Sequence, residues 1–201
     1  MPLSQARRRK TIGLKVAIFG GTFDPIHNAH LRVAREAADR LQLDRVLLVP
    51  SANPPHKPSG TTTPYEDRFR MVALACACDP RFEPSRLEDG QGKSYSIDTI
   101  ERVKAQVGPT DELYFLIGAD AFAEIGSWHR SADVLHAVEF VVVSRPGYAY
   151  PIPPGAKVIG LETLALVISS SEIRRKLDSG EPVEELPDPV LGYIREHGLY
   201  Q

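Results

Sequence analysis

The sequence predicts an α/β protein in which a doubly wound, mostly parallel sheet carries helices on both faces. Strand patterns and helix patterns alternate along the 201 residues, and this order produces parallel strands joined by crossover helices. The predicted strands are continuous apolar runs, which are typical of strands buried on both faces. A chain of this length buries one good core, or one core with a small subdomain.

Six segments have the composition of short strands, and five show the spacing of amphipathic helices. The expected strands are 16–19, 46–49, 82–87, 113–117, 140–143 and 158–161. The expected helices are 31–41, 65–78, 96–107, 170–177 and 189–197. An open sheet of this kind is Rossmann-like, and such sheets bind ligands at the carboxyl ends of their strands. We therefore expect the site in the loops that follow the first, second, fourth and fifth strands.

The chain shows no internal repeat and no linker that divides it convincingly. We therefore expect a single domain over 14–201, with a C-terminal helical part at 169–201 packed on it. Residues 1–13 include four consecutive basic residues at 7–10. A flexible basic arm and a phosphate-binding arm both fit them, and the flexible arm is favoured. The net charge of −2 argues against a general nucleic-acid binder.

The two cysteines, Cys76 and Cys78, do not form a recognisable disulfide or zinc motif. One residue apart in a helical pattern, they point to different sides, and no second pair completes a zinc site. Two reduced, buried thiols fit a cytoplasmic protein. No apolar run approaches the roughly 18 residues of a membrane span, so we expect no membrane contact.

The stretch 16–30 carries the first binding signal. Gly20 and Gly21 follow its apolar run, and we expect them to form a turn whose backbone a Cβ would forbid. His27 and His30 are three residues apart and share one side of a starting helix. Free N–H groups and the helix dipole at such a start bind phosphate. The stretch therefore predicts that both imidazoles contact phosphate.

The stretch 168–177 carries a second signal of the same kind. Ser169 and Glu172 have the spacing of a capping box. Ser170 adds a hydroxyl at this helix start, and Arg174 lies within reach of an anion held there. A well-capped surface helix with ordinary charges is the alternative reading, and the residues leave both open.

Other features exclude one class and suggest further contacts. The Gly20–Gly21 pair does not match GxGxxG, and strand two ends in 49–50 without an acid, so a nicotinamide-dependent oxidoreductase is not expected. Trp128, between polar neighbours, is either a core residue or a platform for a flat ligand. Asp120, at a strand end, either accepts ribose hydroxyls or caps the next helix.

These stretches resemble the signatures of the nucleotidyltransferases. GGTFDPIHNAH is similar to their (H/T)xGH signature, and ISSSEIRRKL to their ISSTxIR signature. With NPPHK at 53–57, SYSIDT at 94–99 and VVSRPGY at 142–148, the chain resembles the nicotinate mononucleotide adenylyltransferase family from about residue 14 to residue 200. That family joins ATP and nicotinate mononucleotide to give deamido-NAD and pyrophosphate. The resemblance implies this activity, and with it a role in NAD biosynthesis.

The resemblance also implies roles for individual residues. It places ATP along Gly20, Gly21, Thr22, Phe23, Asp120, Ile168, Ser169, Ser170 and Arg174. It places the mononucleotide along His56, Lys57, Thr99, Trp128, His129 and Arg145. It assigns the catalytic stabilisation of charge to His27, His30, Lys57 and Arg174. The nucleophile would be a phosphate monoester, which is mostly ionised at neutral pH, so no general base or covalent intermediate is required.

The expected partners are ATP and nicotinate mononucleotide, with Mg²⁺ carried by the ATP phosphates and no metal site built by the protein. Neither a nucleic acid nor a membrane is expected as a partner, and a homo-oligomer is left open. The signature expects Gly where this chain has Ala29. The added methyl is either absorbed by a small shift or narrows the ATP pocket.

Two alternative functions stay open. One is a sister adenylyltransferase that uses nicotinamide mononucleotide, pantetheine phosphate or flavin mononucleotide. The other is a catalytically silent nucleotide sensor on the same fold, which only Ala29 supports.

Overall fold

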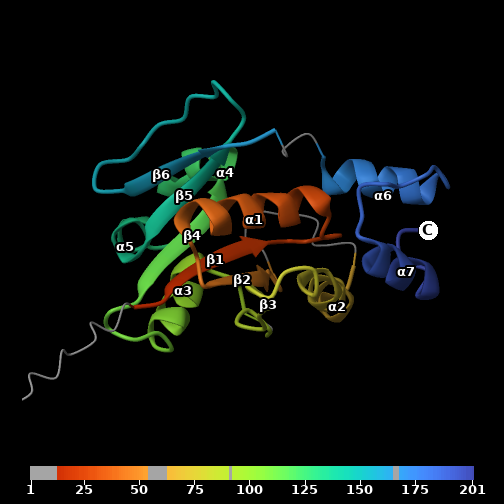
Figure 1. Cartoon of the computed structure of the whole chain (residues 1–201), viewed down its shortest axis with the longest axis horizontal. Coiled ribbons are helices and arrows are strands. Elements are labelled where there is room, and N and C mark those ends of the chain that lie inside the picture. Colours follow the sequence, from red (N-terminus) through yellow and green to blue (C-terminus); the bar gives the residue numbers. More distant parts are fainter. Residues whose placement is uncertain (1–12, 54–62, 91, 165–167) are drawn as a thin grey trace, which may run out of the picture.

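Six parallel strands form the centre of the molecule, which a computed structural model describes over residues 13–53, 63–90, 92–164 and 168–201. The strand order is β3-β2-β1-β4-β5-β6 (Figure 1). The strands are β1 (Lys15–Gly21), β2 (Arg45–Pro50), β3 (Phe82–Pro84), β4 (Glu112–Gly118), β5 (Glu139–Ser144) and β6 (Lys157–Glu162). The predicted α/β class and all six predicted strands are confirmed. The third strand is shorter than predicted: it ends at Pro84, and only the Ser85 N–H beyond it still donates to β2, at the Leu48 carbonyl.

Helices cover both faces of the sheet. They are α1 (Asn28–Leu41), α2 (Tyr65–Cys76), α3 (Ser96–Lys104), α4 (Ala119–Ala123), the 3₁₀ turn η1 (Ile125–Ser127), α5 (Ser131–Ala137), α6 (Ser170–Asp178) and α7 (Asp188–Glu196). The five predicted helices are present. Neither η1 nor α5 was predicted, because so few turns do not establish a helical period.

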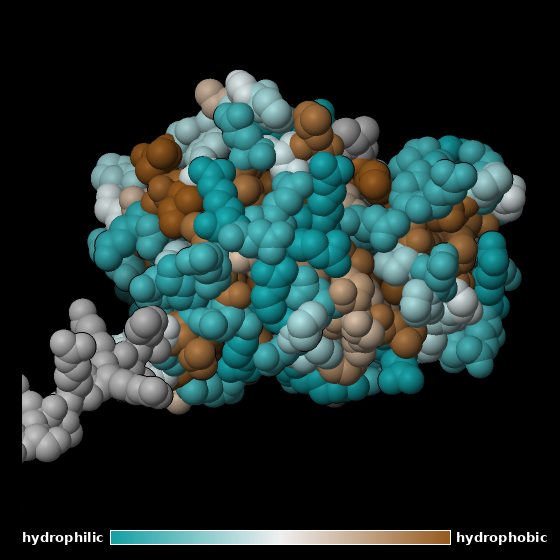
Figure 2. Space-filling view, viewed as in Figure 1, coloured by the Kyte–Doolittle hydropathy of each residue, from teal (hydrophilic) through white to brown (hydrophobic). Residues whose placement is uncertain are grey.

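Successive side chains of β1 point to opposite faces and so belong to two different apolar clusters. Ala17 and Phe19 pack with α1, α2, α6 and α7, whereas Val16 and Ile18 pack with α3, α4 and α5. The outward side of α1 is hydrophilic (Figure 2). The apolar residues of this helix therefore face the sheet, as its amphipathic pattern predicts.

The strand order reverses its direction of growth at β1, which lies between β2 and β4. The parallel register pairs Gly21 with Pro50, and Phe19 with Leu116. The carboxyl ends of these three strands therefore lie side by side at a topological switch point. In open α/β sheets, this is where ligands bind.

The last two helices contribute to the same apolar cluster as α1. Ile173 of α6 and Ile194 of α7 are buried within it. The Tyr193 hydroxyl donates a hydrogen bond to Asp67 Oδ1 on α2 at 2.8 Å. The expected basic arm lies outside the described residues except for Gly13. No helix in the described part of the chain is long and apolar enough to cross a membrane.

Both cysteines are free thiols. Cys76 is buried as expected, but Cys78 is exposed. The expectation of two buried thiols was wrong for Cys78, which lies in the turn that follows the end of α2 at Cys76.

Candidate functional site

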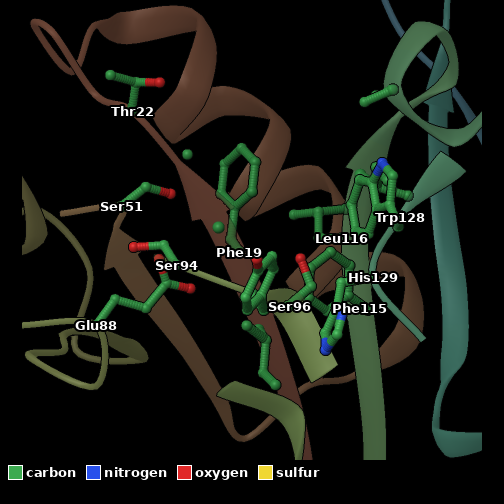
Figure 3. Close-up of a pocket in the computed structure, with 17 residues that line it drawn as sticks. Phe19, Thr22, Ser51, Glu88, Ser94, Ser96, Phe115, Leu116, Trp128 and His129 are labelled. Atoms are coloured by element: carbon green, nitrogen blue, oxygen red, sulfur yellow. The ribbon is translucent and has the colours of Figure 1, made fainter. Parts of the chain in front are cut away.

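A cavity of about 310 Å³ lies at the carboxyl ends of β1 and β4. The residues that line it include the two glycines at the end of β1 and several polar and aromatic side chains: Gly20, Gly21, Thr22, Ser51, Glu88, Ser94, Tyr95, Ser96, Phe115, Trp128 and His129. In Figure 3, Ser94 and Glu88 lie on one side, and Phe115, Trp128 and His129 on the other, with Phe19 between them. The cavity therefore lies where the strand order predicts a ligand site.

Gly20 and Gly21 are the last two residues of β1 and do not form the predicted turn. Neither has a left-handed φ, whereas Phe23, two residues on, has a φ of 49°. A Cβ on Gly21 would come within 3.0 Å of the Phe23 ring. Gly21 thus leaves space for the Phe23 ring, because the chain folds back over it, and the conformational argument for this pair was wrong.

His27 and His30 meet at the start of α1. His27 is the N-cap residue and is 3% exposed. The two rings stack with their centroids 3.7 Å apart, and the His27 backbone N–H donates a 3.3 Å hydrogen bond to His30 Nδ1. The His30 ring also meets Phe23 edge-on at 5.1 Å. The two imidazoles therefore form one unit beside the glycine end of β1.

Both imidazoles are neutral at pH 7 in the free protein. Burial lowers the pKa of His27 to about 4, against a smaller opposing effect from Glu185. Burial, followed by the charge of His27, lowers the pKa of His30 well below its usual value. His27 Nδ1 is buried without a hydrogen-bond partner among the described residues. A buried polar atom of this kind calls for a ligand or water to satisfy it.

The start of α6 packs directly against the loop after β1. Ser169 caps the helix as predicted, because its Oγ accepts a hydrogen bond from the Glu172 N–H at 3.2 Å. The Ser170 hydroxyl donates to the Pro25 carbonyl at 3.1 Å, and Arg174 Nη1 donates to the Asp24 carbonyl at 2.7 Å. The two stretches singled out in the sequence therefore lie together, although about 150 residues separate them.

Trp128 and His129 lie on the aromatic side of the cavity. Trp128 is half-buried and meets Phe115 edge-on at 6.2 Å. His129 is exposed and stacks on Tyr95 at 4.3 Å. Sequence reasoning did not identify Tyr95 as a wall residue. The one sequence feature that could have identified it is its position in a polar segment just before a predicted helix.

Thr99 does not line this cavity. Its side chain is buried beneath the wall, and its hydroxyl donates to Glu88 Oε1 at 2.7 Å. Ser94 and Ser96, which come earlier in the same segment, line the cavity instead. Thr99 lies one helical turn after Ser96 on the same side of α3, where its hydroxyl reaches Glu88 instead of the cavity.

Asp120 and Arg145 lie together at a second hollow, of about 340 Å³, at the ends of β4 and β5. The Tyr148 hydroxyl donates to Asp120 Oδ1 at 2.8 Å. Gly118, which lies at both hollows, is the N-cap residue of α4, so Asp120 is not the helix cap. The hollows are therefore neighbours on one edge of the sheet.

Three further expectations concern residues near the site. His56 and Lys57 lie outside the described residues. Ile168 is half-buried just before Ser169. Ala29 is buried within α1 and does not line the cavity, so its methyl group packs inside the free protein. Among the described residues, no three His, Cys, Asp or Glu side chains gather to hold a metal ion.

The fold and the site define a class: an α/β protein with a cavity at a topological switch point, and with a histidine pair and a serine–arginine helix start that meet at the loop after β1. A family model described as "Cytidylyltransferase-like" matches residues 18–176. The chain is 60% identical to the "Probable nicotinate-nucleotide adenylyltransferase" of Solibacter usitatus (strain Ellin6076), over 93% of this chain and 100% of the relative. The chain therefore belongs to the cytidylyltransferase-like family, among its nicotinate-nucleotide adenylyltransferases.

Two further similarities agree with this assignment. The relative of the same name from Pelobacter propionicus (strain DSM 2379 / NBRC 103807 / OttBd1) is 42% identical, over 93% of this chain and 98% of its own length. The solved structure "Plasmodium falciparum nicotinic acid mononucleotide adenylyltransferase complexed with NaAD" has a TM-score of 0.76 and 21% identity, covering 93% of this chain and 97% of that one. The solved structure supports the fold, and the resemblance read from the sequence motifs is confirmed.

Proposed function

We propose that this chain transfers the adenylyl group of ATP to nicotinate mononucleotide, giving deamido-NAD and pyrophosphate in NAD biosynthesis. The observation that carries the proposal is the meeting of two helix starts, at His27 and at Ser169, across the loop after β1. A polyphosphate held from two sides suits this arrangement. The relatives' shared name supports the same reaction.

ATP would lie along the glycine end of β1 with its phosphates between the two helix starts. His27 and His30 are neutral at pH 7 and would donate hydrogen bonds to phosphate oxygens. Ser170 and Arg174 would face the phosphates from α6. Mg²⁺ bound to the ATP phosphates would neutralise charge there, held by phosphate oxygens and water as this ion prefers.

The mononucleotide would occupy the cavity beside Trp128. Its pyridine ring is flat, and the aromatic side of the cavity offers Tyr95, Phe115 and Trp128 as packing surfaces. Ser94 and Ser96 supply hydroxyl groups on the cavity wall. A hydroxyl group can pair with a carboxylate or with a carboxamide, so the choice of the acid over the amide rests on the name that the relatives share.

The reaction is an in-line displacement at the α-phosphorus of ATP. A mononucleotide phosphate oxygen forms the new P–O bond, and the bond to the bridging oxygen breaks, so that pyrophosphate leaves with the electron pair. The nucleophile has a second pKa of about 6 and is already ionised, so no side chain has to remove a proton. The protein's contribution is positioning, on the order of 7–11 kcal/mol, and preorganised donors, roughly 3–4 kcal/mol each.

Pyrophosphate release from purified protein tests this function. Release with ATP and nicotinate mononucleotide is expected, with kcat/KM about 10²-fold above that for nicotinamide mononucleotide, because a site built for one polar group rejects the other. Pantetheine phosphate and flavin mononucleotide serve as controls for the sister activities. A protein that binds ATP but releases no pyrophosphate with any acceptor would instead be a nucleotide sensor.

We also propose a cytoplasmic location. Both cysteines are free thiols, and Cys78 is exposed to solvent. Free exposed thiols are typical of a reducing compartment.

A further inference from the structure

Arg68, on α2, is a charged residue with no exposed surface. Its Nη1 donates hydrogen bonds to the carbonyls of Thr22 at 2.7 Å and Ser51 at 2.8 Å. Its Nε donates to the carbonyl of Thr63 at 3.1 Å. Arginine is almost never fully buried unless it is paired, and three of its hydrogen bonds here go to the main chain.

The three carbonyls belong to separate segments at the carboxyl edge of the sheet. Thr22 directly follows β1, Ser51 directly follows β2, and Thr63 lies just before α2. Thr22 and Ser51 both line the cavity. One guanidinium therefore connects two walls of the candidate site from behind.

Asp24 extends this connection to the C-terminal part of the chain. The Asp24 carboxylate is buried and accepts a hydrogen bond from the Tyr200 hydroxyl at 2.7 Å. The Asp24 carbonyl accepts the bond from Arg174. Burial lowers the pKa of Arg68, and the charge of Asp24 opposes that effect. Arg68 and Asp24 are thus the charged groups of one buried cluster behind the loop after β1.

Filling space in the core does not by itself account for an arginine at this position. Burying a charge is costly, and a well-packed apolar side chain of similar volume is often at least as stable. An apolar residue would, however, leave the loop carbonyls without donors. A planar guanidinium fixes the directions of its donors, which a lysine ammonium does not. The arginine therefore sets the relative placement of the segments that it joins.

We propose that Arg68, supported by Asp24 and Tyr200, is a positioning residue for the transfer reaction. It touches no substrate. It holds the segments at Thr22 and Ser51 at the separation that brings the two reacting phosphates into line. This inference rests on the proposed function, and it adds to it a group that acts from outside the cavity.

The test compares Arg68→Lys with Arg81→Lys. Arg81 also binds several partners, but at the opposite edge of the sheet, where it pairs with Asp79 and Asp39. For each variant, kcat and KM for ATP are measured at a temperature at which circular dichroism shows it fully folded. Arg68→Lys is expected to lower kcat/KM by about 10²-fold, the usual effect of a small misplacement of reacting groups. Arg81→Lys is expected to stay within about threefold of wild type.

A structural role alone would lower the unfolding temperature of Arg68→Lys and leave its rate per folded molecule unchanged, which would overturn the proposal. If Arg68→Lys does not fold, Tyr200→Phe tests the same cluster by removing one hydroxyl. A loss of about tenfold in kcat/KM supports the proposal, and wild-type kinetics overturn it. Wild-type protein that releases no pyrophosphate overturns the proposed function, whereas an active wild type beside an unchanged Arg68→Lys overturns only the positioning role.

Discussion

Arginines act differently at the two edges of the sheet. At the carboxyl edge, Arg68 and Arg174 donate to main-chain carbonyls of loops. At the amino edge, Arg45 binds the Glu83 carboxylate at 2.6 Å, and Arg81 binds Asp79 at 2.8 Å. Arg68 and Arg174 thus hold backbone shape at the carboxyl edge, where Arg86 also pairs with Glu66 and Asp89, whereas Arg45 and Arg81 pair with acids at the amino edge.

This difference follows from what each edge has to do. Carboxylate pairs at a partly exposed edge stabilise a protein modestly and need no exact geometry. Loops at the carboxyl edge continue beyond the sheet ladder, in which the Ser51 N–H makes the last bond from β2 to β1, to the Gly21 carbonyl. The proposed reaction needs two anions placed in line. Variants at the carboxyl edge should therefore affect catalysis, and variants at the amino edge should affect stability.

The largest effect is expected from His30→Ala. The substitution removes one of the two stacked imidazoles and a proposed phosphate donor. Loss of one such donor should lower kcat by about 10²- to 10³-fold, as measured by pyrophosphate release. His136→Ala, on the exposed side of α5, provides the control. Near-normal turnover of a folded His30→Ala protein would show that the histidine pair does not stabilise the reacting phosphates.

Arg174→Met should have the next largest effect. It removes both a cation beside the proposed phosphates and the hydrogen bond to the Asp24 carbonyl. We expect kcat/KM for ATP to fall by about 10²-fold. The neighbouring Arg175 is exposed and paired with Glu172 and Glu181, so Arg175→Met is the matched control and should change kcat/KM by less than about threefold. Equal effects of the two substitutions would mean that α6 provides only general positive charge.

Local sequence motifs were enough to predict which strands and helix starts form the carboxyl edge. Continuous apolar runs identified the strands, and the histidine and serine–arginine stretches identified two helix starts that the structure brings together. Such features are local, so a sequence displays them directly. The strand order was not predicted, because pairing between strands depends on contacts between distant segments.

Positions defined by three-dimensional contact were the ones that sequence reasoning missed. Arg68 looks like any polar residue of an amphipathic helix, and its carbonyl partners carry no sequence signal. Thr99 lies one turn farther along α3 than Ser96, behind the cavity-lining Glu88, to which its hydroxyl donates. Gly21 was assigned a turn, whereas its role is to leave space for the Phe23 ring. The orientation of a side chain within a known motif therefore required the structure.

The two edges should also lose stability in different pH ranges, and His27 defines the upper one. Its pKa is about 4 in the folded protein and 6.5 as a free group. Below pH 6.5 the imidazole takes up a proton in the unfolded chain but not in the folded protein. The free energy of unfolding is therefore at its full value at pH 7 and decreases as the pH falls toward 4. Between pH 7 and pH 5, wild type should lose about 2 kcal/mol that His27→Gln retains. Urea unfolding across this range measures the difference, and parallel curves would mean that His27 is charged in the folded protein.

Asp79 defines the lower range and gives the smallest expected effect. Hydrogen bonds from Arg81 lower its pKa from 3.8 to about 2, and the side chain is buried. Its stabilisation is therefore complete above about pH 4 and is lost as the pH falls toward 2. Between pH 5 and pH 3, wild type should lose about 1 kcal/mol that Asp79→Asn does not. Each variant serves as the control for the other. Above pH 5, Asp79→Asn should not change the slope of the free energy of unfolding against pH, and below pH 4, His27→Gln should not change it. If both variants instead changed the loss of stability over the same pH range, the two edges would not titrate separately. The contrast between a catalytic edge and a stabilising edge would then fail.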